Sequence, residues 1–131
     1  MERFFLAALC RAPGVGSRVA ASLVRALGAA KNAWQAGAAV LREAHLSPER
    51  AAALHDFCRR NEGLPEAIAA ACEKGGIALF SPADEAYPAL LREIYDPPQT
   101  LFCRGSLDCL SHSAVAMVGA RHASAYGKGA A

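Results

Sequence analysis

The sequence has few aromatic residues and lacks a hydrophobic run of membrane-spanning length. Aromatic side chains make up 7% of the 131 residues, whereas hydrophobic residues make up 53%. Alanine supplies much of that apolar share, and because alanine buries little area per residue, close helix packing is expected rather than a large aromatic core. The apolar start is interrupted by Cys10-Arg11-Ala12-Pro13 before a signal-peptide core is complete, and no segment approaches about 20 apolar residues. The composition therefore predicts a soluble globular protein with no membrane segment.

The cysteines lack the spacing of a disulfide framework or a zinc site. There are five of them, with no CxxC pair. An odd number with no secretory signal predicts reduced thiols in a cytoplasm. Cys109-x-x-His112 supplies half of a metal site, but no second ligand pair of zinc-like spacing exists, so no metal is expected. The four histidines have no serine or carboxylate partner at motif spacing, so no catalytic residue is predicted.

The net charge of +2 conceals an uneven distribution. Residues 1–35 contain five basic and one acidic side chain, residues 36–100 contain six and ten, and residues 101–131 contain three and one. Positive charge thus collects in two stretches, each with a glycine loop. This pattern suggests an anionic partner, with a solvated basic face as the alternative.

The first part of the sequence predicts a string of short helices. Ser17 is a good N-cap and Gly28 is placed to end the helix that follows it. Ser47-Pro48-Glu49 has the cap, the N1 proline and the early acid of another helix start, and this helix is expected to reach Arg60 or Asn61. A further helix follows Pro65 and stops at Gly75-Gly76.

After Gly76 the pattern changes to short apolar runs that predict strands at Ile77–Phe80, Thr100–Cys103 and Ala114–Val118. The last run has no polar alternation, as suits a strand buried on both faces of a parallel sheet. It leads into a loop and then into Ala123–Lys128, which could open a helix, so the segment predicts the first half of a βαβ unit. That helix would be under three turns long, and we therefore expect an N-terminal fragment of a longer protein.

The run from Leu9 to Ala20, which contains Pro13-Gly14-Val15-Gly16, resembles the helix-hairpin-helix family. Glycines at 14 and 16 permit a tight turn with positive φ and leave backbone N–H groups uncovered. Those groups and the start of the next helix form an anion site for a phosphate, with charge added by Arg18. Such a site would contact the DNA backbone rather than bases. The candidate residues are Gly14, Val15, Gly16 and Arg18, and the alternative is a plain interhelical turn.

A second motif is more specific. It reads Tyr87-Pro88-x-x-Leu91-x-x-Ile94-x-Asp96-Pro97-Pro98-x-x-Leu101-Phe102-x-x-Gly105, then Val118-Gly119-Ala120-Arg121-x-x-Ser124-x-Tyr126-Gly127. This pattern resembles the DprA (Smf) DNA-processing family. In that family the Gly-x-Arg segment lies in the DNA-binding pocket, so the resemblance implies a DNA contact at Gly119, Ala120, Arg121, Ser124 and Gly127.

The chemistry of the second motif agrees with a phosphate ligand. A glycine after a strand lets a phosphate approach the backbone, and Arg121 supplies a planar, always-charged donor. A helix that begins near Ser124 would point its N–H groups at the same place. The alternative is a structural ion pair of Arg121 with Asp96 or Asp108.

The resemblance implies an α+β or α/β chain with two domains. Residues 1–75 would form an all-helical, sterile-alpha-motif-like (SAM-like) or helix-hairpin-helix domain, and residues 76–131 the truncated start of an extended Rossmann-like domain. The implied function is non-enzymatic: binding of single-stranded DNA and loading of the RecA recombinase during natural transformation, with a homodimer in the full-length protein. Two alternatives remain, a nucleotide-processing enzyme on a Rossmann-like scaffold and a helical domain that acts only in protein interaction.

Two nucleotide motifs are absent. A dinucleotide fingerprint needs G-x-G-x-x-G, yet Arg121 stands where the second glycine belongs. A Walker P-loop needs a glycine five residues before Gly127 and a hydroxyl residue after Lys128, but His122 and Gly129 occupy those places. No cofactor is therefore expected.

Several single residues have two interpretations. Trp34, Phe4 and Phe5 could stack on bases, but their helical setting favours core packing. Asp84 and Glu85 could form an acidic catalytic pair, but nothing nucleophilic accompanies them in the sequence, and we interpret them as a solvated turn.

Overall fold

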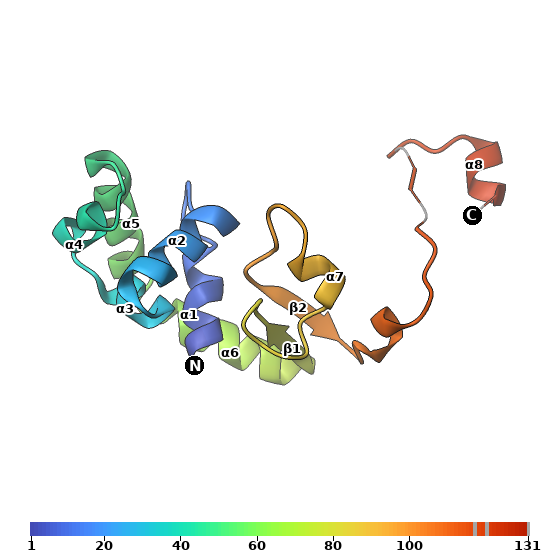
Figure 1. Ribbon diagram of the computed structural model, residues 1–131, viewed down its shortest axis with the longest axis horizontal. Helices are drawn as coiled ribbons and strands as arrows, with labels where there is room; N and C mark the ends of the chain where they lie inside the picture. Colours follow the sequence, from blue (N-terminus) through green and yellow to red (C-terminus); the bar gives the residue numbers. More distant parts are fainter. Residues whose placement is uncertain (117, 120, 131) are drawn as a thin grey trace.

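The computed structural model describes residues 1–116, 118–119 and 121–130. The helices are α1 (Glu2–Leu9), α2 (Ser17–Leu27), α3 (Ala30–Gln35), α4 (Ala38–Glu43), α5 (Pro48–Arg60), α6 (Leu64–Gly75), α7 (Ala89–Arg92) and α8 (Ala125–Ala130). The strands are β1 (Ile77–Phe80) and β2 (Leu101–Arg104), and a 3-10 helix, η1, spans Asp108–Ser111. Figure 1 shows the helices α1 to α6 gathered on one side, the two strands and α7 beside them, and α8 set apart.

The core lies among the first six helices and reaches into β1. Leucine side chains from four different helices are fully or almost fully buried there: Leu9, Leu23, Leu41 and Leu54. Many of the other buried residues are alanines, so the helices approach closely, as the composition predicts. Leu79 of β1 belongs to the same core, and Ile77 packs against it.

At most positions, the helices begin and end where local capping residues and glycines predict. The Ser47 hydroxyl accepts a hydrogen bond from the Arg50 N–H at 3.4 Å, and Pro48 occupies the first turn of α5. Gly28 and Gly76 end α2 and α6 in the left-handed conformation, at φ 81° and 60°. These predicted ends are confirmed.

One predicted cap is wrong. Ser17 is the first residue of α2, and Gly16 takes the cap position, where its carbonyl accepts the Ala20 N–H at 3.0 Å. The first turn of α3 has no cap of its own. It is served by the Glu2 carboxylate of α1, which accepts hydrogen bonds from the N–H groups of Ala30 and Lys31. Side chains distant in sequence can thus satisfy helix ends that local motifs leave open.

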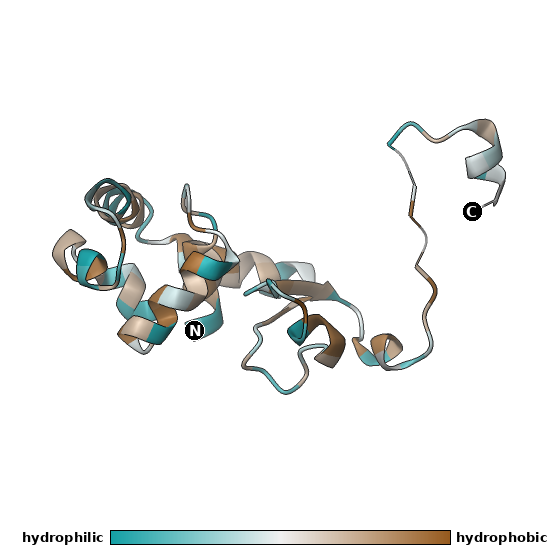
Figure 2. Cartoon of the chain, turned by 45° about the horizontal axis from the view of Figure 1, so that its top comes forward, coloured by the Kyte–Doolittle hydropathy of each residue, from teal (hydrophilic) through white to brown (hydrophobic). Residues whose placement is uncertain are grey.

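Strands β1 and β2 form a two-stranded antiparallel sheet in which Ile77 pairs with Arg104 and Phe80 with Leu101. Both strands were predicted. The Arg104 side chain reaches back from β2 to donate two hydrogen bonds to the Gly75 carbonyl at the end of α6, at 3.1 and 2.9 Å. Figure 2 shows that the strands and the short helix beside them are largely hydrophobic. The coarse prediction of an α+β chain is confirmed.

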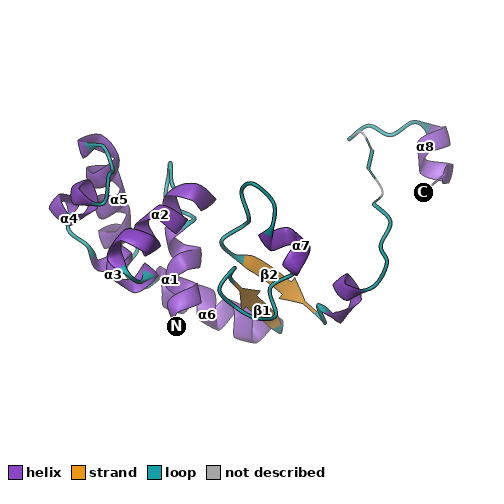
Figure 3. Ribbon diagram, viewed as in Figure 1, coloured by secondary structure: helices purple, strands orange, loops and turns teal. Residues whose placement is uncertain are grey.

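The third predicted strand is wrong for the residues that the structure describes. Ala114–Ala116 and Val118 are in neither strand nor helix and are exposed, and Met117 lies outside the described residues. A strand needs a neighbour to pair its N–H and C=O groups, and the described sheet contains β1 and β2 alone. The described residues of the apolar run therefore have no sheet to join, and Figure 3 shows them as loop. No helix in the described ranges is long and apolar enough to cross a membrane.

Candidate nucleic-acid interface

The hairpin between α1 and α2 matches the predicted turn at one glycine and not at the other. Gly14 has a φ of +75°, as predicted for a tight turn. Gly16 has a φ of −85° and a ψ of 179°, an extended conformation open to any residue, so its predicted positive φ is wrong. Gly16 is extended because it caps α2 rather than turning the chain. The conformational need for glycine is therefore confined to Gly14.

Val15 and the Gly14 carbonyl of the hairpin have structural partners. The Val15 side chain is buried in the core, and its N–H donates to the Ala12 carbonyl at 3.0 Å. The Gly14 carbonyl accepts a hydrogen bond from the Arg50 guanidinium at 2.7 Å. Arg50 comes from α5, 36 residues later in the chain, and no local motif indicates this contact. It adds a second arginine to the hairpin beside Arg18.

The Arg18 side chain is exposed at the start of α2, and its guanidinium lies 5.3 Å from the centre of the Tyr95 ring. This cation–π contact joins the hairpin to the segment that follows α7. Sequence reasoning placed Arg18 in the site but missed Tyr95, because nothing local links residues 77 positions apart.

The residues of the second motif that the structure describes are accessible. Gly119, Arg121 and Ser124 are exposed, and Gly127 is partly exposed. Arg121 takes no part in the ion pairs of the described chain, Arg3–Asp84 and Arg60–Asp56, so no pairing with Asp96 or Asp108 is seen. Ala120 lies outside the described residues.

Ser124 begins the last helix as the sequence predicts. Its hydroxyl accepts the Gly127 N–H at 3.1 Å, and its carbonyl accepts the Lys128 N–H at 3.0 Å. The capping bond occupies the Gly127 N–H, which is therefore not available to a phosphate while the cap is formed. Figure 1 shows α8 set apart from the α1–α2 hairpin, with the two strands and α7 between them, so the two candidate sites are separate.

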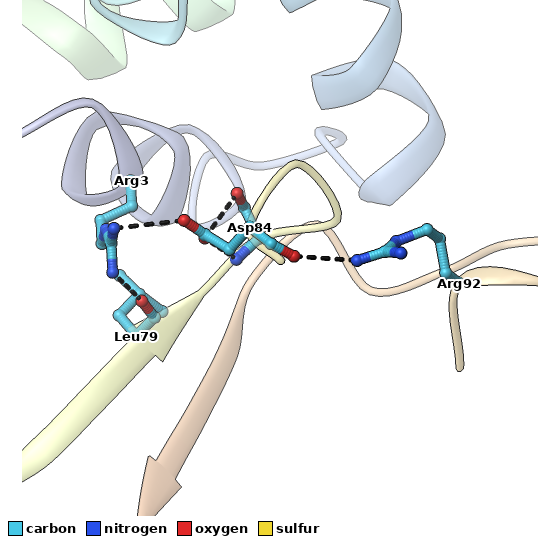
Figure 4. A network of polar contacts seen from close by, with 5 residues as sticks. Arg3, Leu79, Asp84 and Arg92 are labelled. Carbon is cyan, nitrogen blue, oxygen red and sulfur yellow. Dashed lines mark hydrogen bonds and ion pairs between the residues drawn. The ribbon is translucent and has the colours of Figure 1, made fainter. Parts of the chain in front are cut away.

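Asp84 and Glu85 lie in a turn, as predicted, and Glu85 is exposed, but the Asp84 carboxylate is the centre of a polar network rather than solvated (Figure 4). Its carboxylate accepts hydrogen bonds from the Ser81 N–H at 2.7 Å and the Ser81 hydroxyl at 2.9 Å, and it pairs with Arg3 at 3.2 Å. Arg3 also donates to the Leu79 carbonyl at 2.7 Å. Arg92 donates to the Asp84 carbonyl at 2.8 Å. Through Arg3 and Asp84, the network joins α1 to the loop that follows β1.

The Asp84 network makes stability depend on pH. Partial burial would raise the pKa of the Asp84 carboxyl, but the Ser81 hydrogen bonds and the Arg3 charge outweigh it, and the pKa is lowered. A carboxyl with a lowered folded-state pKa stabilises the protein above its unfolded pKa of about 3.9, and this contribution is lost as the pH falls through the folded-state value.

We therefore expect Asp84→Asn to lower the free energy of unfolding at pH 7 by about 1 kcal/mol. Urea unfolding of both proteins should show this difference shrinking below about pH 4, where the carboxyl becomes protonated first in the unfolded chain and then, at lower pH, in the folded wild type. Glu85→Gln is the matched control, because Glu85 is an exposed acidic residue next to Asp84, and the network contacts described above are those of Asp84. A difference that stays constant down to pH 2 would contradict the assignment.

The aromatic residues of the helical part belong to the core. Trp34 is buried and packs edge-to-face against Phe57, with ring centres 6.1 Å apart. Phe5 is buried, and Phe4 is partly buried against the same core. The prediction of core packing is confirmed for all three residues, and base stacking by Trp34 or Phe5 would need the core to open.

All five cysteines are free thiols. Burial raises the pKa of Cys58 to about 11, so this thiol stays protonated and unreactive at neutral pH. Within the described ranges, no three His, Cys, Asp or Glu side chains are grouped so that they could hold a metal ion.

Comparison with known proteins places a family match on the second half of the chain. Residues 78–131 match the family model described as DNA recombination-mediator protein A. The matched range contains β2, the Asp84 network loop and the segment from Gly119 to Gly127.

Two curated relatives are also similar. The DNA processing protein DprA of Bacillus subtilis is 41% identical over 66 residues, which are 50% of this chain and 22% of the relative. The DNA processing protein DprA of Streptococcus pneumoniae is 50% identical over 48 residues, which are 37% of this chain and 17% of the relative. The matches thus span about a fifth of the relatives' length. No solved structure matches the chain.

Proposed function

We propose that the protein belongs to the family of DNA recombination-mediator protein A, whose model residues 78–131 match, and that it binds single-stranded DNA through the DNA's backbone phosphates. The binding serves DNA processing and recombination during natural transformation, in the cytoplasm, and involves no catalytic step. RecA is the proposed protein partner, which the DNA-bound protein helps to load.

The observation that carries this proposal is the accessible Arg121 within the matched segment. Its side chain is exposed and outside the ion pairs of the described chain, so its donors are free to face a ligand. Gly119 has no other atom within 4 Å of the position that a Cβ would occupy, which leaves room for a phosphate beside the backbone. Arginine suits this ligand because its planar guanidinium can donate two parallel hydrogen bonds to phosphate oxygens.

The capping bond of Ser124 refines the proposed site. Because the Gly127 N–H is already bonded to the Ser124 hydroxyl, Arg121 and the Gly119 backbone are the primary contacts. Ser124 and Gly127 then position the start of α8. Ala120 remains a proposed member of the loop.

The wider organisation is part of the same proposal. Residues 1–75 form a SAM-like or helix-hairpin-helix domain, and residues 76–131 supply the beginning of a Rossmann-like domain that forms a homodimer in the full-length protein. The hairpin from Gly14 to Gly16 assists DNA binding, with Arg50 and Arg18 as the charged residues beside it.

The test of this function is the affinity for labelled oligo-dT. We expect Arg121→Ala to weaken binding at moderate salt by about 10-fold, the effect of losing one charge-assisted phosphate contact. The slope of log affinity against log salt concentration should also become shallower by about one, because about one fewer counterion is released. Fluorescence anisotropy at several salt concentrations measures both quantities.

Arg42→Ala is the matched control. Arg42 is exposed on α4, far from α8 in Figure 1, and its loss removes the same charge. Equal affinities for wild type, Arg121→Ala and Arg42→Ala would remove the Arg121 loop from the proposed site.

A further inference from the structure

Tyr95 is an exposed aromatic side chain with a charged neighbour. Its residue is 86% exposed, although it follows the short helix α7 and lies beside the helical part of the molecule. The Arg18 guanidinium lies over the ring, 5.3 Å from its centre. Because the residue remains so exposed with Arg18 over one face, the opposite ring face is open to solvent. Arginine and an open aromatic face are the two components that single-strand binders combine.

Arg18 has no competing partner among the described side chains. It belongs neither to the Arg3–Asp84 nor to the Arg60–Asp56 ion pair, and its guanidinium makes no side-chain hydrogen bond there. Its N–H donors are therefore free at the edge of the stacked pair. The contact with Tyr95 restricts the guanidinium without using these donors.

The exposed face of α2 continues the positive charge. Arg25 is seven residues after Arg18, about two helical turns or 10 Å further along the same face. Ser22 is exposed between them, and α2 contains no acidic residue. Glu93 and Asp96 flank Tyr95 in the chain and are exposed, so a phosphate is favoured on the α2 side of the ring rather than on the loop side.

We propose that Tyr95 and Arg18 form a nucleotide-binding contact for single-stranded DNA, distinct from the Arg121 loop. A base stacks on the open face of Tyr95, its phosphate binds Arg18, and a following phosphate reaches Arg25. This inference rests on the proposed function and adds a second contact region to it. Single-stranded rather than duplex DNA is the ligand because stacking on the ring needs an unpaired base with a free face.

The test compares oligo-dT with an abasic oligonucleotide of the same length, which has the same phosphates but no bases. The wild-type 131-residue chain should bind the abasic strand more weakly, because stacking no longer contributes. Tyr95→Ala should weaken oligo-dT binding by about 5- to 100-fold, the range for loss of stacking on one aromatic side chain. It should also bind the two strands with nearly equal affinity.

Two further variants separate the ring from the charge. Tyr95→Phe keeps the stacking face and should retain near-wild-type affinity and the preference for oligo-dT over the abasic strand. Arg18→Ala should weaken binding to both strands. It should also make the slope of log affinity against log salt concentration shallower by about one, because about one fewer counterion is released. Arg42→Ala again serves as the control for loss of one exposed charge, and thermal unfolding checks that each variant is folded.

The possible outcomes are distinguishable. Wild-type affinity in Tyr95→Ala, combined with weakened binding in Arg121→Ala, would overturn this inference and leave the proposed function intact. Equal affinity of the wild type for the oligo-dT and abasic strands would also overturn it, and that comparison needs no variant that could unfold. Absence of oligo-dT binding by the wild-type chain would overturn both proposals. Loss of binding in Tyr95→Phe as severe as in Tyr95→Ala would exclude ring stacking.

Discussion

Replacing Tyr87 with alanine is expected to lower the free energy of unfolding by about 3–5 kcal/mol, the cost of removing a buried aromatic ring. Tyr87 is only 2% exposed, and its hydroxyl donates a hydrogen bond to the Pro98 carbonyl at 2.9 Å. The Arg92 guanidinium lies 5.7 Å from the ring centre. One side chain thus holds α7 and the proline segment together, and urea unfolding followed by circular dichroism would measure the loss.

Tyr87→Phe separates the ring from its hydroxyl. The ring would still fill its space, and the variant should lose only about 1 kcal/mol for the missing hydrogen bond. Burial raises the pKa of the Tyr87 hydroxyl, so the group remains a donor to Pro98 throughout the neutral range. An alanine variant no less stable than the phenylalanine variant would show that the ring contributes little.

Trp34→Ala is the second substitution with a large expected effect, again about 3–5 kcal/mol. Trp34 is buried in α3 and packs edge-to-face against Phe57 of α5. Its removal would leave a cavity where these helices meet. Thermal or urea unfolding of the variant gives the magnitude.

Trp34→Phe is the conservative control, since it retains an aromatic ring against Phe57 and should cost less. The pair of variants also separates a core role from base stacking. A Trp34→Ala protein that keeps wild-type stability but loses affinity for oligo-dT would contradict the core assignment.

The parts of the fold that local sequence predicts are those fixed by local contacts. The start of α5 at Ser47-Pro48 and the ends of α2 and α6 at Gly28 and Gly76 depend on residues within one turn. Both strands of the sheet were also predicted from short apolar runs. The failed third strand had the same apolar signal, but a strand also requires a neighbour, which composition and periodicity do not reveal.

The parts that local sequence does not predict depend on residues far apart in the chain. Arg3 and Asp84 are 81 positions apart, and Arg50 is 36 positions from the Gly14 carbonyl. An acidic residue three positions after Ser81 looks in sequence like part of any polar turn. Its role emerges only when α1 brings a guanidinium to it.

The candidate site shows the same division. Gly119 and Arg121 were identified by a motif, whereas Tyr95 was not, because its significance comes from Arg18 on a different helix. The bond from the Gly127 N–H to the Ser124 hydroxyl is local, but both residues were assigned to DNA contact, and the bond was therefore not anticipated.

The bonds of Arg3 also bear on the order in which the chain folds during synthesis. Arg3 is translated well before its partners, the Leu79 carbonyl and the Asp84 carboxylate, which lie 76 and 81 residues later in the chain. At about 5–20 residues per second, α1 waits roughly 4–16 seconds on the ribosome before those partners have been synthesised. The nascent helical part therefore attains its final stability only after β1 and the following loop have emerged.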